Sequence, residues 1–295
     1  MKKYVLVEDD FIILKDKTKL FRIRRTFDRV LGGYIEKEEN LSHEGCCWVS
    51  DSAKVFNNAK VCGDAKVKDN AKVAGNACVL DDAEVSDNSI VCDNAKVYGS
   101  AKVANDSRIF GYAHVFDCAE VFGCASVYGY SVVHGHSSIF EKSIINGNVE
   151  ITDNVRIFGN AKIRDNVVVS GNAHIFGYAE VCDNVRVFDN VRIAGHSKIF
   201  GKAQIGGNTK ILSTAYIGNN IKLFESSSFL CIGPIGSRDD YLTIIPLQNY
   251  VATGCWSGTI KQFIKRVDKV HKTFKFKKDY IDAIQYACKY FDVNL

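Results

Sequence analysis

The sequence predicts an all-β solenoid of about ten coils, with a small β cap before it and an α+β cap after it. Every sixth residue from Val49 to Leu223 is aliphatic, which makes thirty consecutive six-residue units, or hexads, without an insertion. A small residue stands two positions before nearly every one of these aliphatic residues, and Gly, Asp or Asn stands two positions after it. A chain that repeats at a short fixed period is a solenoid, in which each unit buries its apolar side against its neighbours.

Each hexad fits one short strand followed by a corner. Alternate residues of a strand point to opposite faces, so the small and aliphatic residues, such as Ala53 and Val55, face inward and Lys54 faces outward. Gly and Asn enter the left-handed backbone region at low cost, so we expect them to turn the chain after each strand. Three strands and three corners then close a triangular coil of 18 residues, and ten coils at ~4.8 Å make a rod of roughly 48 Å.

This aliphatic-x-x-x-small-x unit resembles that of the hexapeptide-repeat proteins, and the thirty hexads span 180 of the 295 residues. The resemblance implies a left-handed parallel β-helix. The flanks at 32–42 and 233–243 look like those of uncharacterised bacterial and phage proteins of this type, which are described as acyltransferase-like. One version of the function that this likeness implies is a phage-type accessory protein that binds and obstructs a host factor.

Three segments follow from the repeat. Residues 1–48 are expected to form an N-terminal cap of short strands, with Trp48 plugging the first coil, because a solenoid end leaves backbone and core side chains uncovered. Residues 49–228 form the β-helix. Residues 229–295 are expected to form an α+β domain, in which a hairpin is followed by a helix capped by Thr259 and by a second helix from about Asp279.

Charge and cysteine content exclude several classes of protein. The net charge of +4 divides into +1 for residues 1–48, −2 for 49–254 and +5 for 255–295, so neither an acidic DNA mimic nor a uniformly basic rod is expected. Eleven cysteines without a Cys-x-x-Cys pair, after an N-terminus that lacks an apolar leader, indicate free thiols and a cytoplasmic location. The sequence contains no apolar run of about 18 residues, so no membrane-spanning segment is predicted.

Enzymatic activity is the first alternative. The resemblance implies an acyltransferase with a catalytic His in a cleft between the subunits of a trimer and a loop that leaves the coil, yet thirty hexads pass without such a loop. A general base needs an orienting partner and a pocket, and the sequence supplies neither for any of the seven histidines. Zinc is considered for Cys118 and His136, which are 18 residues apart and should stack at one corner. His134 and His136 straddle a corner and His114 lies four residues from Cys118, so we do not expect these side chains to converge as zinc ligands would. We therefore expect no catalytic residue, metal or cofactor, with an acyltransferase as the alternative.

Two irregularities of the repeat indicate a binding surface. Four phenylalanines spaced by 18 residues are expected to stack into an outward ladder, which a soluble monomer seldom leaves bare: Phe122, Phe140, Phe158 and Phe176. Beside them runs a stripe that becomes basic towards the C-terminus: Glu120, Ser138, Arg156, His174, Arg192 and Lys210. Aromatic residues that simply cover glycines at the corners would give the same pattern.

The second irregularity lies at the corners between residues 112 and 142. Six successive corners carry bulkier residues in place of Asn or Asp: Tyr112, Cys118, Cys124, Tyr130, His136 and Lys142. A left-handed conformation there would cost about 1–2 kcal/mol each. Drift of the repeat explains them equally well. The functional interpretation is a recognition band, rich in Phe, Tyr and His and including His134, of the kind found in protein interfaces.

The sequence thus predicts a non-catalytic scaffold whose side wall binds another protein or a second copy of itself. Aromatic and basic stripes also stack on and neutralise single-stranded nucleic acid, which is a second alternative.

Overall fold

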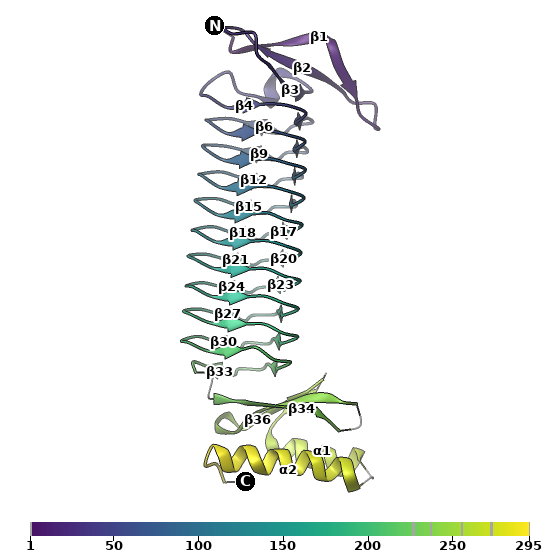
Figure 1. Ribbon diagram of the computed structural model, residues 1–295, viewed down its shortest axis with the longest axis vertical. Coiled ribbons are helices and arrows are strands. Elements are labelled where there is room, and N and C mark those ends of the chain that lie inside the picture. The colour runs from purple at the N-terminus through teal and green to yellow at the C-terminus, as the bar shows by residue number, and fades with distance from the viewer. Residues whose placement is uncertain (1, 226–227, 237, 255, 272–273, 295) are drawn as a thin grey trace. The chain divides into compact units, whose positions relative to one another are not determined.

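The computed structural model describes residues 2–225, 228–236, 238–254, 256–271 and 274–294. Its contacts divide the chain into two compact units, Met1–Asp165 and Asn166–Leu295, and this division falls inside the hexad repeat. Both units contain parallel β-solenoid coils, which wind with a left hand as the resemblance implied (Figure 1).

The first unit opens with an antiparallel hairpin. Strands β1 (Tyr4–Ile13) and β2 (Lys19–Arg25) pair with each other, and β2 pairs antiparallel with β3 (Leu31–Ile35). β3 then pairs in parallel with β5 of the solenoid, so it joins the hairpin to the first coils. This arrangement is visible at the N-terminal end of Figure 1.

The repeat strands of the first unit pair in parallel with strands 18 residues away, as Val85 does with Val67 and Val103. Three strands therefore close each coil, and equivalent strands of successive coils pair into three parallel sheets, one on each side of the coil. The strands are β4 (Trp48–Val49), β5 (Lys54–Val55), β6 (Lys60–Val61), β7 (Lys66–Val67), β8 (Lys72–Val73), β9 (Cys78–Val79), β10 (Glu84–Val85), β11 (Ile90–Val91), β12 (Lys96–Val97), β13 (Lys102–Val103), β14 (Arg108–Ile109), β15 (His114–Val115), β16 (Glu120–Val121), β17 (Ser126–Gly129), β18 (Val132–Val133), β19 (Ser138–Ile139), β20 (Ile144–Gly147), β21 (Glu150–Ile151), β22 (Arg156–Ile157) and β23 (Lys162–Asp165).

The core of each coil is made as the hexad predicts. All thirty aliphatic residues from Val49 to Leu223 are buried, and each burial contributes ~1.5–3 kcal/mol to stability. The small residues two positions earlier are buried as well. Where one of them is Ser, its hydroxyl donates to a carbonyl three residues back, as Ser107 Oγ does to Ala104 O at 2.7 Å, so the buried polar group is satisfied.

The backbone at the corners differs from the prediction that bulky corner residues adopt a left-handed conformation. The positive φ lies two positions after the aliphatic residue, at Gly111 (69°), Gly129 (75°) and their equivalents. The bulkier residues Tyr112, Cys118, Cys124, Tyr130, His136 and Lys142 stand one position later and do not have a positive φ. The left-handed strain that we expected of them is therefore absent, because the turn is made by the residue before each of them, which is Gly in four of the six cases.

Asn at the later corner position has another role. The side-chain amide of Asn58 donates to Asn76 Oδ1 at 3.2 Å, and that of Asn76 donates to Asn94 Oδ1 at 3.0 Å. These bonds connect one coil to the next along a single column of corners. Asn is thus favoured there because it forms a hydrogen-bonded ladder, and the turn itself does not require it.

An incomplete turn precedes the predicted repeat. Ile35, Leu41 and Cys47 are spaced by six and buried, and Leu41 forms a parallel bridge with Val61. The hexad pattern does not predict this turn, because the turn is offset by two residues from the frame of Val49 and the short 3₁₀ helix η1 (Glu38–Asn40) interrupts it.

Tyr4 closes this first turn in place of Trp48. The Tyr4 side chain is fully buried, and its hydroxyl donates to Leu41 O at 2.7 Å, with Glu38 O at 2.9 Å from the same oxygen. Trp48 lies on the outer face, where the Arg25 guanidinium stands 4.5 Å from its ring centroid. The expectation that Trp48 plugs the coil is therefore wrong, since the strand alternation directs its side chain outward.

The second unit continues the parallel pairing at the same 18-residue interval, as between Val187 and Ile205. Its repeat strands are β24 (Val168–Val169), β25 (His174–Ile175), β26 (Glu180–Val181), β27 (Arg186–Val187), β28 (Arg192–Ile193), β29 (Lys198–Ile199), β30 (Gln204–Ile205), β31 (Lys210–Ile211), β32 (Tyr216–Ile217) and β33 (Lys222–Leu223).

A small α+β fold completes the second unit. Its antiparallel sheet is formed by β34 (Leu230–Ile235), β35 (Asp240–Ile245), β36 (Tyr250–Thr253) and β37 (Trp256–Gly258), with the 3₁₀ helix η3 (Pro246–Gln248) between β35 and β36. Helices α1 (Ile260–Val270) and α2 (Phe274–Tyr290) pack on it. Thr259 caps α1 as predicted, because its hydroxyl accepts from Gln262 N at 3.2 Å. The sheet has four strands where the sequence predicted a two-stranded hairpin.

The sheet satisfies backbone groups at the end of the last coil. Thr243 Oγ1 accepts from Tyr216 N at 2.8 Å, the Tyr250 hydroxyl accepts from Gly218 N at 2.9 Å, and Gln248 Oε1 accepts from Lys222 N at 3.0 Å. Burial raises the pKa of Tyr250 to about 12. This segment therefore covers the open edge of the coil, which would otherwise expose unpaired N–H groups.

Candidate functional site

The most unusual surface of the first unit is a group of rings that follow the core aliphatic residues between 98 and 140. Of the eight residues that directly follow a core aliphatic residue in this interval, seven are aromatic or imidazole rings. We call them, together with Tyr112 and Tyr130, the aromatic band: Tyr98, Phe110, Phe116, Phe122, Tyr128, His134 and Phe140. They follow strands of all three sheets, so the band surrounds the coils.

The rings of the band stack from coil to coil. On one face Phe122 and Phe140 are parallel within 1° with centroids 4.9 Å apart, and Phe140 and Phe158 stack at the same distance. On a second face Tyr98 stacks on Phe116 at 4.7 Å.

The same second face continues with His134, which stacks on Phe116 at 4.8 Å, and a third face carries Phe110 against Tyr128 at 4.5 Å. The 18-residue spacing thus produces the predicted ladder in the first unit, and two further ladders that the sequence analysis did not single out.

Tyr112 and Tyr130 are the most exposed members of the band. Tyr112 is 52% exposed and Tyr130 is 63% exposed. Their rings stack with centroids 5.0 Å apart and within 6° of parallel. They occupy the column of corners in which Asn58, Asn76 and Asn94 form the amide ladder, 18 residues further on in each case. At this point the column changes from hydrogen-bonded amides to exposed apolar rings.

The predicted basic stripe is distributed over both units. In the first unit Ser138 pairs with Glu120 and with Arg156, and the Arg156 guanidinium lies 5.5 Å from the Phe140 centroid. In the second unit the predicted residues His174, Phe176 and Arg192 lie close together: His174 pairs with Arg192, whose guanidinium lies 5.8 Å from the Phe176 centroid. Each arginine therefore covers a phenylalanine face in a cation–π arrangement.

His134 has two carboxylates beside it. Its Nδ1 lies 3.6 Å from Asp117 Oδ2 and its Nε2 lies 3.9 Å from Glu150 Oε1, and 24% of its side chain is exposed. Both distances exceed those of a hydrogen bond, and Thr152 Oγ1 lies 3.5 Å from the same Nδ1. The ring also lies parallel to that of Phe116, within 6°. His136, the other histidine of the predicted recognition band, is exposed at its corner.

Tyr98 of the band and the neighbouring His114 have shifted pKa values. Burial lowers the pKa of His114, which lies edge-on to Tyr98 with centroids 6.1 Å apart, and burial raises the pKa of Tyr98. The imidazole of His114 is therefore held in its neutral form more strongly than a free histidine. This is a consequence of packing against the neighbouring rings.

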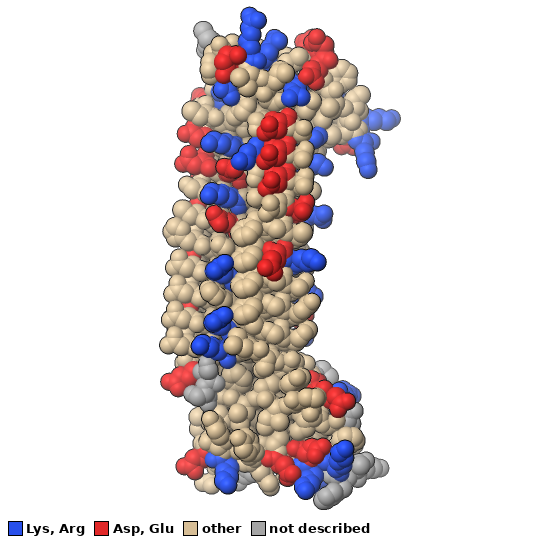
Figure 2. All heavy atoms as spheres, in the orientation of Figure 1, with Lys and Arg blue, Asp and Glu red and all other residues tan. Residues whose placement is uncertain are grey.

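Charged side chains gather elsewhere. On the face shown in Figure 2, acidic and basic residues form columns over the coils nearest the N-terminal strands. Several corner carboxylates have a structural partner, as Asp81 Oδ2 accepts from Gly99 N at 3.0 Å and Asp93 Oδ2 accepts from Gly111 N at 3.0 Å. These carboxylates therefore satisfy backbone donors of the next coil, whereas the exposed rings of Tyr112 and Tyr130 satisfy no such group.

The structure also bears on disulfide bonds and on membrane-spanning helices. The ten cysteines within the described ranges are free, and Cys118 and Cys124 are exposed at separate corners. None of the helices in the described part of the chain is long and apolar enough to cross a bilayer.

The chain is similar to a known protein in structure. No protein-family model and no curated protein matches the chain. Among solved structures, the chain is similar to UDP-N-acetylglucosamine acyltransferase from Campylobacter jejuni, with 16% identity and a TM-score of 0.29 over 75% of this chain and 94% of that one. A likeness at this level says nothing about activity.

Proposed function

We propose that this chain is a non-catalytic β-solenoid scaffold that binds a protein partner through the aromatic band. The observation that carries the proposal is the pair Tyr112 and Tyr130, which stack on each other yet keep more than half of their exposure. Tyrosine is enriched among the residues that dominate the binding energy of protein interfaces.

Stacking prepares these rings for binding. Immobilising a flexible side chain costs ~0.5–1.5 kcal/mol during association, and a ring that is already held against its neighbour has lost part of that freedom. The surrounding ladders of the band, such as Phe122 on Phe140, present further ordered apolar surface. A partner with an apolar surface and acceptors for the tyrosine hydroxyls fits this arrangement.

A purely structural role explains the tyrosines less well than a binding role. Asn at the same column supports neighbouring coils through hydrogen bonds, as Asn76 does with Asn94. Tyr112 and Tyr130 replace that ladder with rings that are half exposed to water. Water exposure of stacked apolar surface is relieved when a partner covers it.

The test compares the double variant Tyr112→Ala/Tyr130→Ala with Tyr178→Ala. Tyr178 is a matched control, because it is 57% exposed and stacks on His196 at 4.8 Å but lies outside the band. Proteins retained by the immobilised chain, and self-association measured by sedimentation, are compared for the three proteins. The proposal expects association to be lost in the double variant and kept in the control.

Association that persists unchanged in the double variant contradicts the proposal. Loss of self-association alone identifies the partner as a second copy of the chain. Circular dichroism of all three proteins checks that the coils are intact.

An acyltransferase is the second candidate, and the surroundings of His134 favour it. A general base needs an orienting group, and Asp117 and Glu150 flank this imidazole at 3.6 and 3.9 Å. Titration with acetyl-coenzyme A decides between the candidates. Heat that is lost in His134→Ala supports an acyl-coenzyme A site at this residue, as the acyltransferase requires, and no heat for the unaltered protein counts against it.

A further inference from the structure

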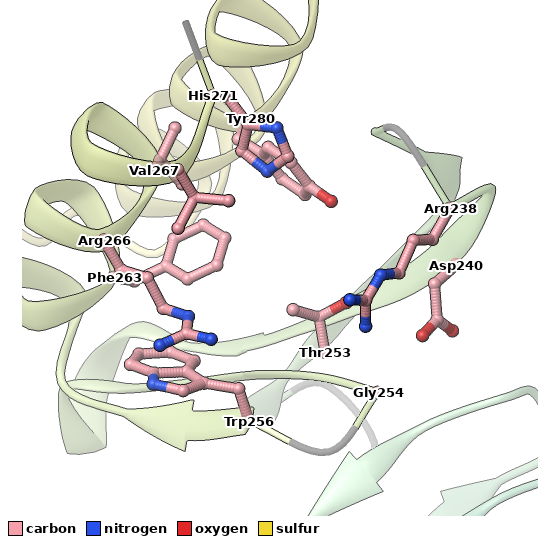
Figure 3. Close-up of a pocket in the computed structure, with 11 residues that line it drawn as sticks. Arg238, Asp240, Thr253, Gly254, Trp256, Phe263, Arg266, Val267, His271 and Tyr280 are labelled. Carbon is pink, nitrogen blue, oxygen red and sulfur yellow. The ribbon is translucent and has the colours of Figure 1, made fainter.

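The second unit contains a pocket that has no part in the function proposed above. Its volume is about 160 Å³, and it lies between the ends of β35, β36 and β37 and the two helices (Figure 3). Arg238 reaches it from the turn before β35 and Asp240 from the start of β35, Arg266 and His271 from α1 and its C-terminal end, and Tyr280 from α2. Residues that are distant in sequence thus converge on one cavity.

Cationic groups predominate around this cavity. Arg238 and Arg266 lie on opposite sides of it in Figure 3. Neither guanidinium has a carboxylate within 4.0 Å among the residues that the structure describes. Asp240 is the acidic residue of the lining, and its Oδ1 already accepts from Tyr241 N at 2.7 Å. Two guanidinium groups and one carboxylate leave a net charge of +1 when His271 is neutral.

One wall of the cavity is aromatic. The Trp256 and Phe263 centroids are 5.4 Å apart, and Phe263 meets Tyr280 edge-on at 5.4 Å. The Arg266 guanidinium stands 5.8 Å from the Trp256 centroid, so the cation borders the apolar surface. A cavity of roughly 150 Å³ holds one benzene ring, so this volume suits a ligand with a body of that size.

The Tyr280 hydroxyl provides an independent indication of a ligand. The residue is only 6% exposed, and within the described ranges its hydroxyl has no hydrogen-bond partner. Figure 3 shows the hydroxyl directed towards the space in front of Arg238. The fully buried, unpaired polar atoms of the described residues do not include this oxygen, so the hydroxyl is open to the pocket and can donate to an acceptor bound there.

Gly236 makes room for this hydroxyl. A Cβ at that position would lie 2.0 Å from Tyr280 Oη, and Gly236 also has a positive φ of 76°. Burial raises the pKa of Tyr280, so the hydroxyl keeps its proton near neutral pH and is available as a donor. The position of this donor is therefore fixed by the packing around it.

We propose that this pocket binds a small organic carboxylate with a body about the size of one ring. The carboxylate lies between Arg238 and Arg266 and accepts from the Tyr280 hydroxyl, while the body packs against Trp256 and Phe263. Guanidinium groups match the geometry of a carboxylate, and one negative charge balances the lining. A phosphate monoester offers similar oxygens but carries about one charge more.

Calorimetry with the full-length chain tests the proposal, with benzoate as the probe. Saturable binding is expected, and benzyl alcohol, which has the ring without the charge, should bind at least tenfold more weakly. Arg238→Gln and Arg266→Gln should each weaken benzoate binding by about tenfold or more, and Tyr280→Phe by about fivefold, as the loss of hydrogen bonds to a charged acceptor implies. Lys261→Gln on the exposed side of α1 is the matched control and should bind as the unaltered protein does.

Three results overturn the proposal. Benzoate could show no saturable binding up to about 10 mM, benzyl alcohol could bind as tightly as benzoate, or both arginine variants could bind benzoate unchanged. Phenyl phosphate that binds tenfold more tightly than benzoate overturns the assignment to a carboxylate. The exposed arginines and the isosteric Tyr280→Phe leave the core intact, and thermal unfolding of each variant verifies it.

Discussion

Substitution of Gly129 tests how the corners of the coil are built. Gly129 has a φ of 75°, and a Cβ added to it would lie 2.8 Å from Gly147 N and 2.9 Å from Gly147 O. A left-handed alanine costs about 1–2 kcal/mol, and a contact this short against backbone adds to that cost. We expect Gly129→Ala to lower the free energy of unfolding by about 2–4 kcal/mol.

Tyr130→Asn is the matched comparison, because Tyr130 does not have a positive φ. This variant loses the stacking contact with Tyr112 and should lose only about 0.5–1.5 kcal/mol. Urea unfolding followed by circular dichroism measures both changes. Hydrogen exchange at the corner amides shows whether the loss is local, as expected for a solenoid in which neighbouring coils stabilise each other. A stable Gly129→Ala, or a Tyr130→Asn that gains more than about 1 kcal/mol, would refute the placement of the turn.

The remaining predictions concern the aromatic band and its alternatives. Burial depresses the pKa of His114 below its ordinary 6.5, so the unfolded chain binds more protons below that pH. The free energy of unfolding should therefore fall as the pH drops below about 6.5, and His114→Gln should reduce this slope, as urea titrations at several pH values would reveal. Phe140→Ala removes two stacking contacts and should destabilise the protein by about 2–3 kcal/mol, measured in the same way; no measurable change would show that the ladder is decoration. If the chain binds single-stranded nucleic acid instead, a salt-dependent gel shift should weaken on neutralising Arg156 and Arg192, and no shift at low salt excludes that alternative.

The fold was predictable because one pattern specifies it many times over. The aliphatic residue and the small residue two positions earlier both face the core in every hexad, so single exceptions do not obscure the period. Which corner residue adopts the left-handed conformation was harder to predict. Gly or Asp and the following Asn both tolerate a left-handed backbone, and composition alone could not show that the first of the two adopts it.

The candidate surfaces were predictable to different degrees. The ladder of Phe122, Phe140 and Phe158 follows from the period, because residues 18 apart meet on neighbouring coils. The pocket around Arg238 and Arg266 could not be read from the sequence. These residues belong to the turn before β35 and to α1, 28 positions apart, and only the packing of α1 on the sheet brings them to one cavity.

The affinity of the chain for its partner, measured before and after Tyr112→Ala/Tyr130→Ala, tests the proposed function most directly. Truncation of two interface tyrosines should cost about 2 kcal/mol or more, so the dissociation constant should rise about 30-fold or further. Tyr178→Ala should leave it unchanged. A dissociation constant that the double variant alters by less than about twofold would contradict the account.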